Sequence, residues 1–273
     1  MKKLFRVIYP FFIYNIIGIL VLQGVFFLYL MLSETSGIMN PGQTAADKLD
    51  MQLVYLTAAA AVLSFLIMFP FYRKDCVLRG RMPERIITKA EGLWKILILG
   101  AAVCIFGNNL VTLSGIDKLS AGYEAVSDTL YSIPLTAQLL CLGLCIPMGE
   151  EMVFRILGFR RLRDDMGFLP AALISAFLFG LYHGNLVQAV YASVLGFIIA
   201  LAYEYHDSFA VPILIHISAN IFSVVITALP RWVGTPSVGI MVLETLFTLG
   251  IIIVILRKMK RSREESISGG MPC

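Results

Sequence analysis

The chain has 273 residues, 58% of them hydrophobic, and its mean hydropathy is +0.82. Soluble domains average about 45–50% apolar residues, so the composition excludes an ordinary soluble domain and indicates a polytopic membrane protein. The net charge of +4 does not indicate nucleic-acid binding, because the basic residues flank apolar segments and are not interleaved with exposed aromatic residues.

Eight apolar segments are candidates for membrane spans, which need about 20 mostly apolar residues each. In chain order they cover residues 8–32, 52–72, 94–113, 131–157, 169–184, 186–204, 209–229 and 237–256. The sequence therefore predicts an all-α fold with about eight transmembrane helices. We expect one integral-membrane domain over residues 1–263. Residues 264–273 are polar and rich in serine and glycine, which predicts a disordered tail.

The distribution of lysine and arginine predicts the orientation in the membrane. The N-terminus, the second and fourth connections and the C-terminal segment together carry 19 basic residues, against 3 on the opposite side. We therefore expect both termini in the cytoplasm. In a bacterium the membrane would be the plasma membrane.

Three polar clusters interrupt the apolar segments. Residues 150–155 read EEMVFR, residues 179–183 read FGLYH and residues 216–220 read HISAN. Ionisable groups at membrane depth are costly and usually face a protein interior or a wet cavity. The clusters therefore predict a buried functional site within residues 131–229.

The first cluster holds two carboxylates with different expected roles. Glu151 and Arg155 are four residues apart and share a helix face, so Arg155 can pair with Glu151 and orient it. Glu150 points about 100° away on a helix and does not share that partner. We expect Glu150 to be free to act as a general base.

The other two clusters supply imidazoles and an amide. Phe179 is four residues before His183, so its ring can support the imidazole. His216 and Asn220 are also four apart and could converge on one point, either to stabilise an oxyanion or to orient a water. Glu150 and His183 could hold and activate that water.

A metal centre is the competing interpretation of the same residues. Two histidines and a carboxylate, namely His183, His216 and Glu150, match a catalytic set for a divalent metal such as zinc with one open position. The helical His-Glu-x-x-His signature is absent from the chain. Both interpretations stay open at this stage.

The pattern E-E-x-x-x-R, F-x-x-x-H and H-x-x-x-N over about residues 145–225 resembles the CPBP family. This family comprises CAAX prenyl proteases and bacteriocin-processing (Abi) intramembrane endopeptidases. One departure is Ile156, where many members have glycine after the arginine. The resemblance implies a membrane-embedded hydrolase that cuts a peptide bond in a membrane-associated peptide or protein within the lipid bilayer.

The resemblance also implies residue roles. Glu150 would be the base that activates water, Glu151 its neighbour paired to Arg155, and His183 the second activating group. His216 and Asn220 would bind water, metal or the oxyanion. Members have been described both as metalloproteases and as glutamate-dependent proteases, so the resemblance does not decide the cofactor.

Two other classes compete with the protease. A non-catalytic membrane immunity or scaffold protein could reuse the same fold. A transporter with a proton relay would be expected to show paired halves or broken helices, and no repeat is visible in the sequence. One geometric difficulty also arises. A fourth span ending near residue 157 would put Glu150 roughly 12 Å from the cytoplasmic end, and His183 roughly 21 Å from it.

Overall fold

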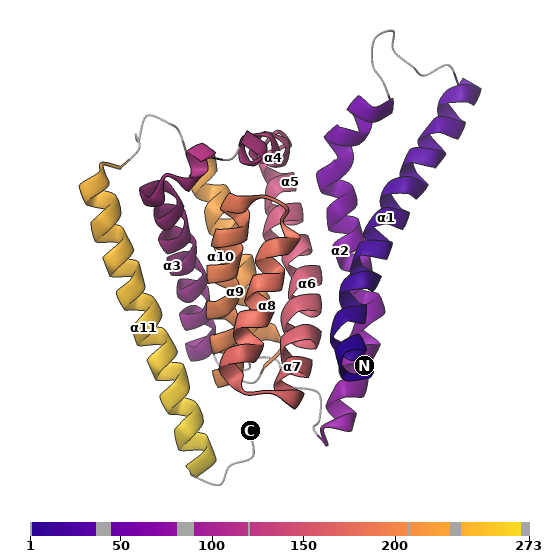
Figure 1. The fold of residues 1–273 in the computed structure, drawn as a ribbon. Coiled ribbons are helices and arrows are strands. Elements are labelled where there is room, and N and C mark those ends of the chain that lie inside the picture. The colour runs from indigo at the N-terminus through magenta and orange to yellow at the C-terminus, as the bar shows by residue number, and fades with distance from the viewer. Residues whose placement is uncertain are drawn as a thin grey trace.

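The computed structural model describes residues 2–36, 45–80, 90–119, 121–206, 208–229 and 236–268, and every regular element in them is helical. This confirms the predicted all-α class (Figure 1). The elements are α1 (Lys2–Ser36), α2 (Ala45–Leu78), α3 (Ala90–Ser114), η1 (Ile116–Leu119), α4 (Ala121–Tyr131), α5 (Leu135–Gln138), η2 (Leu139–Cys145), α6 (Ile146–Glu151), η3 (Met152–Phe159), α7 (Arg160–Asp165), α8 (Phe168–Tyr182), α9 (Leu186–His206), α10 (Ala210–Ala228) and α11 (Val238–Ser268).

Six helices in the described part of the chain are long and apolar enough to cross a membrane, and they correspond to six of the eight predicted spans. The predicted fifth span is the shorter apolar helix α8. α11 continues to Ser268, so residues 264–268, which we predicted to begin a disordered tail, are helical. Residues 269–273 lie outside the described residues.

The predicted fourth span is a run of helical segments from α5 to α7 and is the irregular element of the fold. η2 and η3 are π-helical and lie on either side of α6. Pro147 stands in the first turn of α6 and has no backbone N–H to donate, which is consistent with a local change of hydrogen-bond register. Such π-helical segments often mark functional sites.

The helical run also extends further than the sequence predicted. It ends at Asp165 and not near residue 157, so Glu150 lies 15 residues before its end (165 − 150). His183 lies 15 residues after the start of α8 (183 − 168). Both are therefore roughly 22 Å from the same end of the bundle at ~1.5 Å per residue. Glu150 and His183 therefore lie at similar depth, and the difference expected from the sequence is not present.

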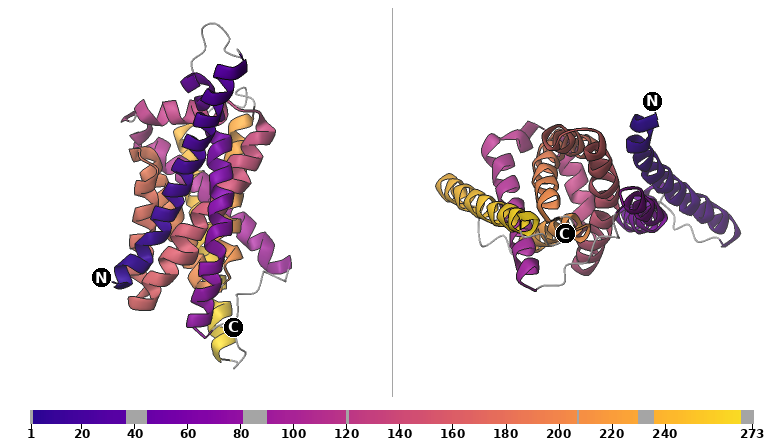
Figure 2. Two further views of the ribbon diagram at one scale, coloured as in Figure 1. Left: turned by 90° about the vertical axis from the view of Figure 1, so that its right-hand side faces the viewer. Right: turned by 90° about the horizontal axis from the view of Figure 1, so that it is seen from below.

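The helices form a central bundle with one flank at each side. α11 lies on one side and the α1–α2 pair on the other (Figures 1 and 2). Both flanks expose large apolar side chains, such as Phe12 and Ile19 on α1, and Leu243 and Phe247 on α11. Such surfaces suit contact with lipid tails.

Small residues let the bundle helices approach closely around the polar clusters. A Cβ on Gly149 would lie 2.7 Å from the Ala61 carbonyl oxygen of α2, and one on Gly100 would lie 2.4 Å from the Ile215 oxygen of α10. Close backbone contact through small residues is typical of helices that pack in membranes. Gly149 immediately precedes Glu150, so this contact fixes the segment that carries both carboxylates.

An ionic cluster ties α1, α2 and α7 together at the end of the bundle near the N-terminus. Asp75, only 3% exposed, accepts hydrogen bonds from Arg161 Nε at 2.6 Å and from Arg6 Nη2 at 2.9 Å. Arg161 also donates to the Arg6 carbonyl at 2.6 Å and to the Tyr9 hydroxyl at 2.8 Å. This cluster joins the α1–α2 flank to the helical run that carries the polar clusters.

Asp75→Ala should destabilise the protein, because it leaves the buried guanidinium of Arg161 without its carboxylate. Breaking a buried ion pair costs about 3–5 kcal/mol, and thermal unfolding of the purified protein in detergent would measure the loss. Glu264→Ala is the matched control, since Glu264 is 65% exposed and pairs only loosely with Lys260 at 3.8 Å. Equal midpoints for the two variants would contradict the structural role of Asp75.

Candidate active site

The Glu151 carboxylate joins two helices at the centre of the site. Its Oε1 accepts one hydrogen bond from Arg155 Nη1 at 3.1 Å and another from His216 Nδ1 at 2.8 Å. Glu151 and Arg155 are fully buried and His216 is 3% exposed. The i,i+4 pair expected from the sequence is therefore present. It also holds the imidazole of α10, a contact that the spacing did not indicate.

Glu150 differs from its neighbour in its partners. Within the described residues it makes no direct hydrogen bond, and its Oε2 lies 3.8 Å from His216 Nε2. It also interacts electrostatically with His183. The residue is 6% exposed. The structure thus places Glu150 close to His183 and His216. Of the two carboxylates, only Glu151 makes direct hydrogen bonds within the described residues.

His183 stands at the end of α8, where Gly184 follows with a φ of +72°. This left-handed conformation favours glycine and ends the helix. The His183 Nδ1–H donates to the Phe179 carbonyl at 2.8 Å, because a carbonyl oxygen can only accept. In the neutral ring, Nε2 is then the unprotonated nitrogen and can accept a proton or a hydrogen bond.

The Phe179 ring positions three of the polar groups. It is fully buried, and both imidazoles meet it edge-on, with ring centroids 4.9 Å away for His183 and 5.6 Å away for His216. The Arg155 guanidinium lies over the ring, 4.0 Å from its centroid, at a distance typical of a cation–π contact. Phe179 therefore supports His183, as predicted, and also spaces it from His216 and Arg155.

Asn220 takes a different partner from the one expected. Its side-chain amide donates to the Leu142 carbonyl of η2 at 2.9 Å, while His216 turns to Glu151. Ser175 likewise donates to the Phe154 carbonyl of η3 at 2.7 Å. The hydrogen bonds that the structure shows for His216 and Asn220 thus go to different acceptors, a carboxylate oxygen and a π-helical carbonyl.

Two tyrosines near Glu150 were missed by the sequence analysis. Tyr14 of α1 and Tyr182 of α8 each interact electrostatically with Glu150, and their rings pack with centroids 5.8 Å apart. Tyr182 could have been found, because it directly precedes His183. Nothing in the sequence indicated that Tyr14 lies near Glu150, because it belongs to the first apolar segment and Glu150 to the fourth.

The positions of the nitrogen and carboxylate donors bear on the metal interpretation. Nitrogen and carboxylate ligands of the right kind are present, but no three His, Cys, Asp or Glu side chains among the described residues are grouped closely enough to hold an ion. Both imidazoles are held through Nδ1, and Nε2 is the nitrogen that could face an ion. Because the donors among the described residues are not grouped around one point, we derive no step through a metal.

Comparisons with known proteins agree with the motifs. The family described as "Type II CAAX prenyl endopeptidase Rce1-like" matches residues 132–222, a segment that contains all three polar clusters. The resemblance to the CPBP family is thereby confirmed over this part of the chain, about a third of its length. No solved structure matches the chain.

Two relatives each match part of the chain. The chain is 30% identical over 116 residues to a protein of Bacillus subtilis (strain 168) named "Putative membrane peptidase YdiL", which is 42% of this chain and 47% of that protein. It is 33% identical over 98 residues to "UPF0177 protein YxdF" of Lactococcus lactis subsp. lactis (strain IL1403), 36% of this chain and 54% of that protein. The chain therefore spans about half the length of the curated relatives it matches.

Gly196→Ala should disrupt the site from outside the three clusters. A Cβ there would lie 2.1 Å from Arg155 Nη2 and 3.3 Å from the Phe179 ring. The guanidinium is held by Glu151 and cannot yield freely, so we expect a thermal midpoint several degrees lower in detergent.

Gly250→Ala is the matched control for this change. It also lies within a helix, but its added Cβ would meet nothing within 4 Å. Alanine is favoured over glycine in helices, so this variant should be at least as stable as the wild type. A Gly196→Ala protein as stable as the control would show that Arg155 is not held in the described position.

Proposed function

We propose that this protein is an intramembrane endopeptidase that hydrolyses a peptide bond in a membrane-associated peptide or protein. The observation that carries the proposal is that two adjacent buried carboxylates have different hydrogen-bond partners. Glu151 is bound by Arg155 and His216, while Glu150 has no direct hydrogen bond among the described residues and faces His216 and His183. A purely structural ion pair would not need the second carboxylate.

In the proposed reaction Glu150 is the general base. It takes a proton from a water that also donates to the unprotonated Nε2 of His183, and the water oxygen attacks the scissile carbonyl carbon. Glu150 then returns the proton to the leaving amine nitrogen, which breaks the C–N bond. The products are a carboxylic acid and an amine, so the balance requires only water. General acid–base catalysis of this kind contributes about 10²–10⁴-fold.

His216 and Asn220 are the proposed groups that stabilise the oxyanion. His216 Nδ1–H is used by Glu151, so Nε2 can donate to an oxyanion only when the ring is an imidazolium. Asn220 uses one amide hydrogen on Leu142 and retains a second for an oxyanion.

The proposed substrate class follows from the position of the site and from the family. The site lies roughly 22 Å from the end of the bundle. A soluble substrate would have to enter the membrane-embedded protein to that depth, whereas a membrane-associated substrate is already there. The matched family is described as a CAAX prenyl endopeptidase. A divalent metal held by Glu150, His183 and His216 remains the alternative activator of the water. A non-catalytic scaffold remains the alternative function.

Glu150→Gln should abolish proteolysis while the protein still folds and inserts into the membrane. The amide keeps the size of the side chain but cannot accept the proton, so turnover should fall by about 10²–10⁴-fold. Purified protein incubated with a peptide library, with products identified by mass spectrometry, would measure this loss.

Glu244→Gln is the control for the loss of a carboxylate within a span. Glu244 accepts a hydrogen bond from Asn109 in α3 at 3.2 Å, away from the site, and its variant should retain full turnover. Unchanged turnover in Glu150→Gln would remove this residue as the base. Absence of products from the wild type with every peptide would favour the scaffold.

The proposed orientation puts both termini and the basic end of the bundle in the cytoplasm. Lys260→Cys on α11 and Ser132→Cys before α5 lie at opposite ends and have exposed side chains. In a cysteine-free background, a membrane-impermeant maleimide applied to intact cells should label residue 132 and not residue 260. The reverse labelling pattern would overturn the orientation.

A further inference from the structure

The reaction proposed above uses neither Tyr14 nor Tyr182, although both interact with Glu150. Tyr14 comes from α1 and is only 5% exposed. Tyr182 is the last residue of α8 and directly precedes His183. The family match covers residues 132–222, so α1 brings a polar group to the site from outside the matched segment.

Ring packing holds Tyr182 between the carboxylate segment, α1 and an imidazole. Phe154 follows Glu150 by about one turn on the same helical run, and its ring lies 5.5 Å from the Tyr182 ring between centroids. The Tyr182 ring also lies 5.8 Å from that of Tyr14 and 5.7 Å from that of His183. Both phenol rings are therefore fixed next to the groups that are proposed to activate water.

The two hydroxyls have few partners for groups in this position. They interact with each other and with the Glu150 carboxylate, and neither has another hydrogen-bond partner in the described part of the chain. Each phenol carries one hydrogen, so one hydrogen remains when one hydroxyl donates to the other. Glu150 in turn receives no direct hydrogen bond from the described residues. Buried polar groups are nearly always bonded to protein or to ordered water, and a water between the hydroxyls and Glu150 would satisfy both.

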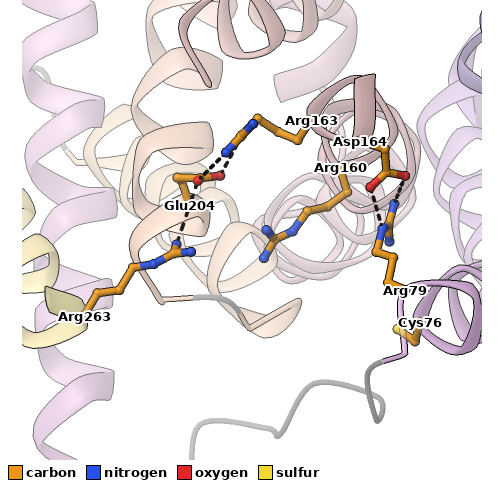
Figure 3. A pocket seen from close by; sticks show the side chains of 7 residues that line it. All are labelled: Cys76, Arg79, Arg160, Arg163, Asp164, Glu204 and Arg263. Atoms are coloured by element: carbon orange, nitrogen blue, oxygen red, sulfur yellow. Dashed lines mark hydrogen bonds and ion pairs between the residues drawn. The ribbon is translucent and has the colours of Figure 1, made fainter. Parts of the chain in front are cut away.

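The charged groups at the basic end of the bundle differ, because they satisfy one another directly. Asp164 accepts two hydrogen bonds of 2.9 Å from Arg79, and Glu204 accepts from Arg163 at 2.9 and 3.2 Å (Figure 3). These ion pairs join helices by direct contact. Beside Glu150, direct contact between protein groups leaves a hydrogen and a carboxylate acceptor unused.

We propose that the Tyr14–Tyr182 pair positions the water that Glu150 activates, by donating a hydrogen bond to the water oxygen. The inference rests on the peptidase function proposed above. In that reaction the water donates one hydrogen to Glu150 and the other to Nε2 of His183. Its oxygen accepts from the tyrosine pair with one lone pair, and the other lone pair attacks the scissile carbonyl carbon.

The number of partners suits a bound water. Buried waters make about three hydrogen bonds, with a range of two to four, and Glu150, His183 and the tyrosine pair supply three. The third bond stops the water from turning about the other two and directs the free lone pair to the substrate. The tyrosine hydrogen stays on its oxygen throughout, so the balance of the hydrolysis is unchanged.

A kinetic test uses the double variant Tyr14→Phe/Tyr182→Phe, which keeps both rings and removes both hydroxyls. We expect kcat to fall about tenfold, the effect of one lost hydrogen bond. KM should stay unchanged, because the lost bond acts on the water and not on the peptide. A merely structural role would instead lower the thermal midpoint and leave kcat per folded molecule unchanged. Tyr55→Phe on α2 is the matched control, since this side chain is 41% exposed, and it should keep full kcat.

An experimental structure tests the water without peptidase activity. In the wild type we expect an ordered water within hydrogen-bonding distance of Glu150 and of one of the two hydroxyls. The double variant should lose this water or hold it at reduced occupancy.

The outcomes separate this inference from the proposed function. Full kcat in the double variant, with a wild type that cleaves its peptide, would overturn the inference and leave the peptidase intact. A wild type that cleaves no peptide but holds the water between Glu150 and the tyrosine pair would overturn the peptidase and retain the water site. A water on Glu150 that contacts neither hydroxyl would overturn the inference in either case.

Discussion

The low polarity of the surrounding bundle is the constraint on which the rest of the site depends, because every buried charge there must find a partner. Glu151 meets this constraint by accepting from both Arg155 and His216 through one oxygen. Removing either donor would leave a buried carboxylate undercompensated, which is costly. The same two bonds set the position of α10 relative to the carboxylate segment, and so they place His216 opposite Glu150.

The irregular fourth span is the second condition for this arrangement. Two π-helical segments enclose the short helix that carries Glu150 and Glu151, and side chains of α10 and α8 bind their carbonyls, through Asn220 on Leu142 and Ser175 on Phe154. These hydrogen bonds fix three helices around the carboxylates. Gly149 against Ala61 adds α2 by direct backbone contact. The positions of the site residues thus depend on backbone contacts as well as on the charged groups.

The two charged regions of the protein have different compositions. At the candidate active site the Glu151 and Arg155 charges are paired, and Glu150 is the additional acidic group. At the basic end of the bundle, the Asp75 cluster joins helices through Arg161 and Arg6. Charged groups near the headgroup region cost less free energy than charged groups at the depth of Glu150.

The sequence by itself determined the all-α class, most span positions and the Glu151–Arg155 pair, because these follow from local apolar runs and from four-residue spacing on one helix. Tertiary structure decided the rest. The bond between Glu151 and His216 joins helices 65 residues apart, and Tyr14 reaches Glu150 only through the packing of α1. Asn220 turned to Leu142 because a π-helical carbonyl lies beside it. Such contacts depend on the relative depth and rotation of separate helices, and a continuation of the fourth span to Asp165 was enough to change that depth.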